Sequence, residues 1–131
     1  MTQRQEVLRD KLLQGVSLFK EVEALRSYIM ENEKIAAGTH DPRILGLIRE
    51  QTLALDEEYE KLLDIRAKID KCISSVTDPE LRAILTMRYL GHTNTFVIAE
   101  RLNYSRNSIN RKHKAALDKI IENGADKYLD F

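Results

Sequence analysis

The chain has 131 residues, and its 21 basic side chains are balanced by 21 acidic ones, so no overall field draws it to nucleic acid. Charged residues make up 32% of the sequence, and the low count of five glycines and two prolines is typical of long helices. These totals predict an all-α protein of one domain, or one domain with an appendage.

The cysteine content and the hydropathy predict where the protein resides. Cys72 is the only cysteine, which excludes an internal disulfide and gives no sign of export. The opening residues are polar and do not resemble a signal peptide. No apolar run approaches the ~20 residues that a membrane span needs. We therefore expect a cytoplasmic protein with no membrane contact.

The first long helical pattern covers residues 4–36. Its apolar side chains recur at helical spacing, which predicts one buried stripe. The stripe comprises Leu8, Leu12, Phe19, Val22, Leu25 and Ile29. Gly15 takes a missing position in it and either admits a close neighbour or weakens the helix. Gly38 ends the pattern, and Asp41 with Pro42 starts the next helix.

The second long pattern covers residues 42–74 and predicts an antiparallel hairpin with the first. Its expected seam comprises Ile48, Thr52, Leu55, Tyr59, Leu62, Ile65, Ile69 and Ile73. At ~1.5 Å per residue each helix is about 50 Å long, and a short turn joins the two. Other apolar residues, including Leu45, Leu53 and Leu63, lie outside this seam. Because a hairpin hides one side of each helix, we expect a second copy or the C-terminal part to cover the rest.

A third helix is predicted from Pro79 to Leu90, and residues 94–120 then have the pattern of a helix-turn-helix. A short helix, capped by Thr93 or Asn94, runs to Asn103, a residue type that tolerates the left-handed backbone of a tight turn. Its buried face carries Ile98, Ala99 and Leu102. Ser105 caps a second helix. Such a pair of helices can lay the second one in the major groove of DNA.

A helical wheel divides the second of these helices into an apolar face and a basic face. The inward face comprises Ile109, His113, Ala116, Leu117 and Ile120. The residues expected to contact bases are Arg106, Asn107, Asn110 and Arg111. The residues expected to contact phosphates are Arg101, Ser105, Lys112, Lys114 and Lys119. Arginine can bind guanine through two hydrogen bonds, and asparagine can bind adenine in the same way. The competing interpretation is a solvated face of an amphipathic helix.

Three segments between Asp78 and Leu117 resemble region 4 of bacterial sigma factors: DPELRAILTMRYLG, IAERL and SRNSINRKHKAAL. Behind a long helical N-terminal half, this pattern is similar to phage-encoded transcriptional activators of the RinA and ArpU type. The resemblance implies a three-helix, sigma region 4-like module that follows the hairpin and reads the upstream promoter element. Lys112 departs from the pattern, because an apolar residue often stands there. Its stem can lie along the edge of the core with the amine in water.

No spacing in the sequence assembles a catalytic or metal site. The chain lacks a glycine-rich phosphate loop, a nucleophile elbow and a Cys or His pair with metal spacing. Its three histidines fall in two loops and one helix core. We therefore expect no enzyme activity, no cofactor and no metal.

Three functions remain open. The first, which we prefer, is a sequence-specific transcription regulator of phage or prophage origin that reads double-stranded DNA. The second is a packaging protein similar to a small terminase subunit, and the third is a sigma-like adaptor that binds RNA polymerase.

The predicted division of the chain has three parts. The hairpin occupies residues 1–75 and serves oligomerisation or partner docking, the DNA-binding module occupies residues 76–123, and residues 124–131 form a frayed tail. A homodimer formed through residues 4–74 would present two reading helices to a repeated or palindromic site.

Overall fold

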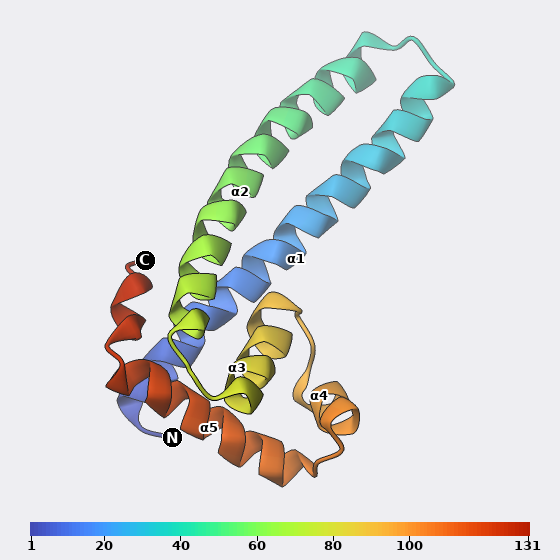
Figure 1. Cartoon of the computed structure of the whole chain (residues 1–131). Helices are drawn as coiled ribbons and strands as arrows, with labels where there is room; N and C mark the ends of the chain where they lie inside the picture. Colours follow the sequence, from blue (N-terminus) through green and yellow to red (C-terminus); the bar gives the residue numbers. More distant parts are fainter. The chain divides into compact units, whose positions relative to one another are not determined.

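The computed structural model describes all 131 residues and is all-α, with five α-helices and no strand (Figure 1). The elements are α1 (Gln3–Ala37), α2 (Pro42–Ser74), α3 (Pro79–Leu85), the π turn η1 (Thr86–Leu90), α4 (Thr95–Leu102), α5 (Arg106–Glu122) and the 3₁₀ turn η2 (Ala125–Tyr128). These bounds match the predicted helix spans to within two residues, except that α3 ends at Leu85 and η1 continues it to Leu90. No helix of the chain combines the length and the apolarity that crossing a bilayer requires.

Side-chain caps fix where the three short helices begin. The Asp78 carboxylate accepts hydrogen bonds from the amides of Glu80 and Leu81, at 2.9 and 3.1 Å. Asn94 caps α4 by accepting from the Val97 amide at 2.9 Å. The Ser105 hydroxyl accepts from the Ser108 amide at 3.1 Å and caps α5. The first backbone amides of a helix have no hydrogen-bond partner within the helix, and a polar side chain just before it can accept from them. The starts of these three helices therefore depend on residues that are near in the sequence.

The helix predicted from Pro79 to Leu90 changes character after Leu85. The Gly91 amide donates to the Thr86 carbonyl at 2.8 Å, five residues back, which closes a π turn. A π turn holds one more residue than an α turn and therefore shifts the register of the residues that follow. Tyr89, within this turn, is 1% exposed.

The chain forms two units, and their boundaries differ from the predicted division. The composite unit comprises residues 1–16 and 65–131, and the two-helix unit comprises residues 17–64. The predicted boundary at residue 75 is therefore wrong, because the core of the C-terminal helices includes residues from the start of α1 and from the end of α2. That core contains Leu8, Leu12, Val16, Ile69, Cys72, Ile73, Leu85, Tyr89, Leu117 and Ile120. Helices as short as α3 and α4 bury too little apolar surface to stand alone.

Gly15 lies at a close approach within the composite unit. A Cβ atom added there would lie 2.5 Å from Cδ1 of Ile69 and 3.5 Å from Cγ2 of Ile65. Of the two readings that the sequence allowed for Gly15, close packing of a neighbouring helix is the one that the structure supports.

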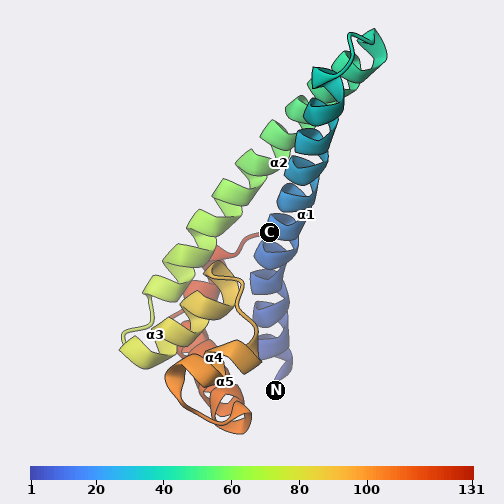
Figure 2. The ribbon, with the colours of Figure 1, turned by 90° about the vertical axis from the view of Figure 1, so that its right-hand side faces the viewer.

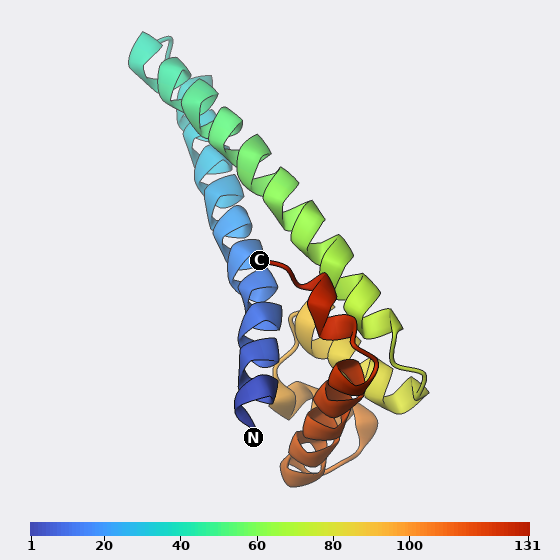
Figure 3. The same cartoon turned by 90° about the vertical axis from the view of Figure 1, so that its left-hand side faces the viewer.

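The segment 124–131 is folded, so the prediction of a frayed tail is wrong. Gly124 turns the chain with a φ of +69°, and Ala125 and Leu129 join the core of the composite unit. Lys11 Nζ donates to the Leu129 carbonyl at 2.9 Å, and Lys68 pairs with Asp130 at 2.9 Å. Figure 3 shows this segment running back between the start of α1 and the end of α2. Burial of apolar side chains offsets the entropy lost on ordering the segment.

In the two-helix unit, α1 and α2 run antiparallel on either side of the short loop after Ala37 (Figure 1). The seam holds an unexpected polar pair: Asn32, 5% exposed, donates from Nδ2 to Oε1 of Gln51 at 2.8 Å. The predicted seam is wrong at Thr52 and Tyr59, which are exposed. Because the amides of Asn32 and Gln51 satisfy each other, polar residues can occupy the seam, and the buried face of α2 turns toward Gln51.

Candidate nucleic-acid interface

The turn between α4 and α5 has the left-handed residue that the sequence predicted. Asn103 has φ 61° and ψ 43°, and the Tyr104 amide donates to the Ala99 carbonyl at 2.9 Å. Ile98 and Ala99 of α4 pack with Ile109 of α5 in a small cluster that also includes Ile84 of α3. The turn and this cluster fix how α5 crosses α4 (Figure 2).

The inward face of α5 is the predicted one. Ile109, Ala116, Leu117 and Ile120 are each no more than 1% exposed. His113 lies on the same face, and its Nε2 is 2.5 Å from the hydroxyl of Tyr89. Burial, together with the smaller effect of the charges of Arg88 and Arg9, lowers the pKa of His113 to about 4. Burial also raises the pKa of Tyr89 to about 12, so both rings are neutral near pH 7.

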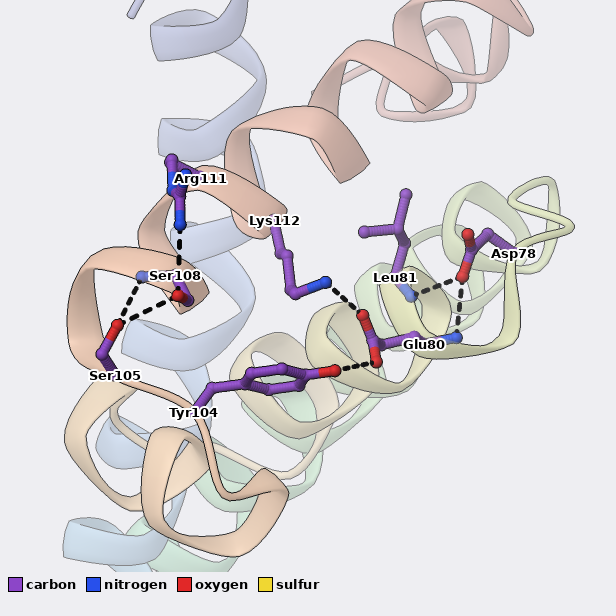
Figure 4. Close-up of polar contacts among 8 residues, drawn as sticks. All are labelled: Asp78, Glu80, Leu81, Tyr104, Ser105, Ser108, Arg111 and Lys112. Carbon is purple, nitrogen blue, oxygen red and sulfur yellow. Dashed lines mark hydrogen bonds and ion pairs between the residues drawn. The ribbon is translucent and has the colours of Figure 1, made fainter.

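The residues predicted to contact bases lie together on the opposite face of α5. Arg106, Asn107, Asn110 and Arg111 are all exposed, and none of them forms an ion pair. Arg111 is the one whose position is fixed by a neighbour, because its Nη2 donates to the Ser108 hydroxyl at 3.2 Å. The Ser105 hydroxyl in turn donates to the Ser108 hydroxyl at 3.0 Å (Figure 4). These side chains are available to an external partner.

The residues predicted to contact phosphates are less uniform. Arg101 and Lys114 are exposed and have no acidic partner. Lys119 forms an exposed pair with Glu122 at 3.2 Å, a kind of pair that holds a side chain only weakly. The Ser105 hydroxyl is occupied as the cap of α5.

Lys112 differs from the other basic residues of α5 because its amine is already paired. Its Nζ lies 2.5 Å from Oε1 of Glu80, whose Oε2 accepts a hydrogen bond from the Tyr104 hydroxyl at 2.7 Å (Figure 4). The same amine lies 4.8 Å from the centroid of the Tyr104 ring. These hydrogen bonds hold the pKa of Glu80 below its usual value, with Lys112 contributing most. The three residues join the start of α3 to the turn and to α5.

Sequence reasoning missed both Glu80 and the surface beside Arg111. A hollow of about 350 Å³ is lined by Ser108, Arg111, Lys112 and Ala115. The spacing of these four residues places them on one side of α5, but an exposed alanine carries no polar signal. Glu80 lies 24 and 32 residues from its two partners, and no local pattern links positions so far apart.

A larger hollow of about 530 Å³ lies between the end of α2 and α3, with no residue of α5 in its lining. Its only basic residue, Arg82, donates to the Val76 carbonyl at 3.2 Å. No group of three or more His, Cys, Asp or Glu side chains in the chain is arranged to hold a metal ion. The outward face of α5 is therefore the candidate site that the residues support best.

No protein family, curated protein or solved structure matches this chain.

Proposed function

We propose that this chain is a sequence-specific transcription regulator that reads double-stranded DNA with α5. One observation carries the proposal: α5 buries its apolar face and presents Arg106, Asn107, Asn110 and Arg111 to solvent, without acidic partners. Arginine and asparagine are the residue types that recognise guanine and adenine edges through paired hydrogen bonds. Acidic neighbours one helical turn away, which stabilise exposed helix faces through ion pairs, are absent beside both arginines.

The way α5 is held supports the same proposal. A helix that reads bases has to keep one orientation while it lies in the major groove. The left-handed Asn103, the Ser105 cap and the link from Glu80 to Lys112 all restrict the start and the middle of α5. We propose that α3, α4 and α5 form a sigma region 4-like helix-turn-helix module following a helical hairpin. The resemblance to phage activators makes a phage or prophage origin part of this proposal.

The two-helix unit is proposed to bring two reading helices together. It exposes large apolar side chains from both helices: Tyr28, Met30, Ile35, Leu45, Leu53, Tyr59 and Leu63. Two copies could cover these residues in a four-helix bundle. A single module makes few phosphate contacts, so a dimer that binds two half-sites gains affinity through tethering, by ~100-fold or more. RNA polymerase is the alternative occupant of this apolar surface.

The test starts with the full chain and a library of random DNA duplexes. Repeated selection should enrich one short motif, and binding to it should exceed binding to random duplex by at least ~10³-fold. Arg111→Ala should cost ~1–3 kcal/mol at the selected site and relax the preference at one base position. Arg43→Ala is the matched control, because Arg43 is an exposed arginine that pairs with Asp41 in the two-helix unit.

Two results would contradict the proposal. One is a selection that enriches no motif with the full chain. The other is an Arg111→Ala variant that binds selected and random duplexes as the wild type does. A ring of many subunits on native mass spectrometry would favour the packaging function instead.

A further inference from the structure

The hollow beside Arg111 combines a charged hydrogen-bond donor with an apolar surface. Ser108, Arg111, Lys112 and Ala115 line it, and Ala115 is exposed on the outward side of α5. Ala115 has only a methyl group, so nothing from its own side chain fills the space between its neighbours. The hollow therefore offers an apolar floor immediately next to a guanidinium group.

The neighbours of Ala115 are held in ways that keep this floor accessible. Ser108 accepts a hydrogen bond from Arg111 Nη2 at 3.2 Å and restrains the guanidinium group on one side. The amine of Lys112 is directed to Glu80, 2.5 Å away, and the side chain runs toward α3 (Figure 4). The charged end of Lys112 is thus held at Glu80 and that of Arg111 at Ser108, and both side chains border the hollow beside Ala115.

Two adjacent features of the DNA major groove match this arrangement. Guanine presents two acceptors, N7 and O6, which an arginine can bind together. Thymine presents a methyl group at C5, and it is the only one of the four standard bases that does. Alanine side chains make apolar contact with this methyl group in DNA complexes.

We propose that the hollow takes the 5-methyl group of a thymine next to the guanine that Arg111 reads, so that Ala115 is a specificity-determining residue. This inference rests on the proposed function, because it assumes that α5 lies in the major groove. It adds a base preference that the polar side chains of α5 do not provide. The selected motif should contain a guanine with a thymine beside it.

Replacing thymine by uracil tests this inference, since uracil differs from thymine only by the missing methyl group. Each thymine of the selected duplex is replaced in turn, and the binding of the full chain is measured by fluorescence anisotropy. We expect one replacement, next to the guanine whose preference Arg111→Ala relaxes, to weaken binding about fourfold, the effect of one buried methyl group. In Ala115→Gly the same replacement should have less than half of this effect.

Glu122→Gly is the matched control, because it places a glycine in the same helix at an exposed position outside the hollow. Loss of its ion pair with Lys119 should change the affinity for thymine and uracil duplexes equally. This variant should keep the wild-type difference between thymine and uracil. Circular dichroism of both glycine variants checks that α5 remains helical.

The inference is overturned if no thymine replacement changes binding, or if Ala115→Gly keeps the full fourfold difference. Either outcome leaves the proposed function standing, because the motif and the effect of Arg111→Ala are unaffected. A selection that enriches no motif removes the proposed function and this inference together.

Discussion

The hydroxyl of Tyr89 lies 2.5 Å from Nε2 of His113, and this contact joins the π turn to α5. Because the ring of His113 is buried and two arginines act on it, its pKa is lowered to about 4 from an ordinary value of 6.5. The folded protein therefore resists protonation of His113, whereas the unfolded chain accepts the proton readily. This difference makes the stability of the composite unit dependent on pH.

We predict that stability is fully present above pH 6.5 and decreases as the pH falls toward 4. Between these values the unfolded state binds a proton at His113 that the folded state does not, and the loss reaches about 3 kcal/mol. Urea unfolding at a series of pH values measures it. His113→Gln should be less stable at pH 7 but should show a flatter profile between pH 6.5 and 4. A variant profile as steep as that of the wild type would show that another group is responsible.

The pairing of Lys112 with Glu80 leads to a prediction about salt dependence. Lys114 is exposed and has no acidic partner, so Lys114→Met should reduce the slope of log affinity against log salt by about one. Lys112→Met should change this slope by much less, since its amine already has a carboxylate partner in the free protein. Titrations of the selected duplex at four salt concentrations measure both slopes. Equal reductions in the two variants would mean that Lys112 leaves Glu80 for a phosphate when DNA binds.

The composite unit predicts which fragments fold. Residues 76–131 lack Leu8, Leu12, Ile69 and Ile73 of the core, so this fragment should be largely unfolded. This prediction differs from the division expected from the sequence, in which residues 76–123 form a module separate from the hairpin. Joining residue 16 to residue 65 through a short linker should keep the unit folded, because Gly15 lies against Ile65 and Ile69. Thermal unfolding followed by circular dichroism compares the two, and a cooperative transition in 76–131 would show that the shared core is dispensable.

The same linked variant also tests the role of the two-helix unit. It lacks residues 17–64 and should sediment as a monomer, whereas the full chain should sediment as a dimer at tens of micromolar. Its affinity for the selected duplex should be lower by ~100-fold or more, since binding at two half-sites is lost. Equal affinity of the two proteins, with a monomeric full chain, would indicate a docking role for the two-helix unit.

The polar pair in the seam of the two-helix unit gives a prediction about stability. Gln51→Ala removes the acceptor of Asn32 Nδ2 and leaves a buried amide without its partner, which should cost about 1–3 kcal/mol. Replacing both Asn32 and Gln51 by leucine should restore that stability or exceed it. Glu50→Ala, at the exposed neighbouring position, should change stability by less than ~0.5 kcal/mol. Urea unfolding of the wild type and the three variants measures these differences. If Gln51→Ala is as stable as the wild type, Asn32 finds another partner.

Features that depend on neighbours in the sequence could be predicted, and features that depend on distant contacts could not. The starts of α3, α4 and α5 follow from Asp78, Asn94 and Ser105, each of which accepts from an amide two or three residues later. The inward face of α5 follows from helical periodicity. In α2, by contrast, seams through Thr52 or through Gln51 fit the periodicity equally well. In the structure, Gln51 accepts a hydrogen bond from Asn32 of the opposite helix, a contact that the periodicity of α2 does not contain.

The same reasoning applies to the candidate site. The polar residues of its outward face could be identified because arginine and asparagine have a chemistry suited to bases. The pairing of Lys112 with Glu80 could not be predicted, because it depends on the path of α3 relative to α5. The docking of residues 124–131 required the path of α1 and α2 in the same way.

The composite unit imposes an order on folding during synthesis. Lys11 contacts the Leu129 carbonyl across 118 residues of sequence, and Gln5 contacts Asp118 across 113. The first turns of α1 leave the ribosome long before the side chains that cover them, and their apolar stripe stays exposed in the meantime. Residues 17–64 need only one another and form their contacts earlier. Closing so long a loop is slow relative to local helix pairing, so the composite unit becomes complete only after α5 has been released.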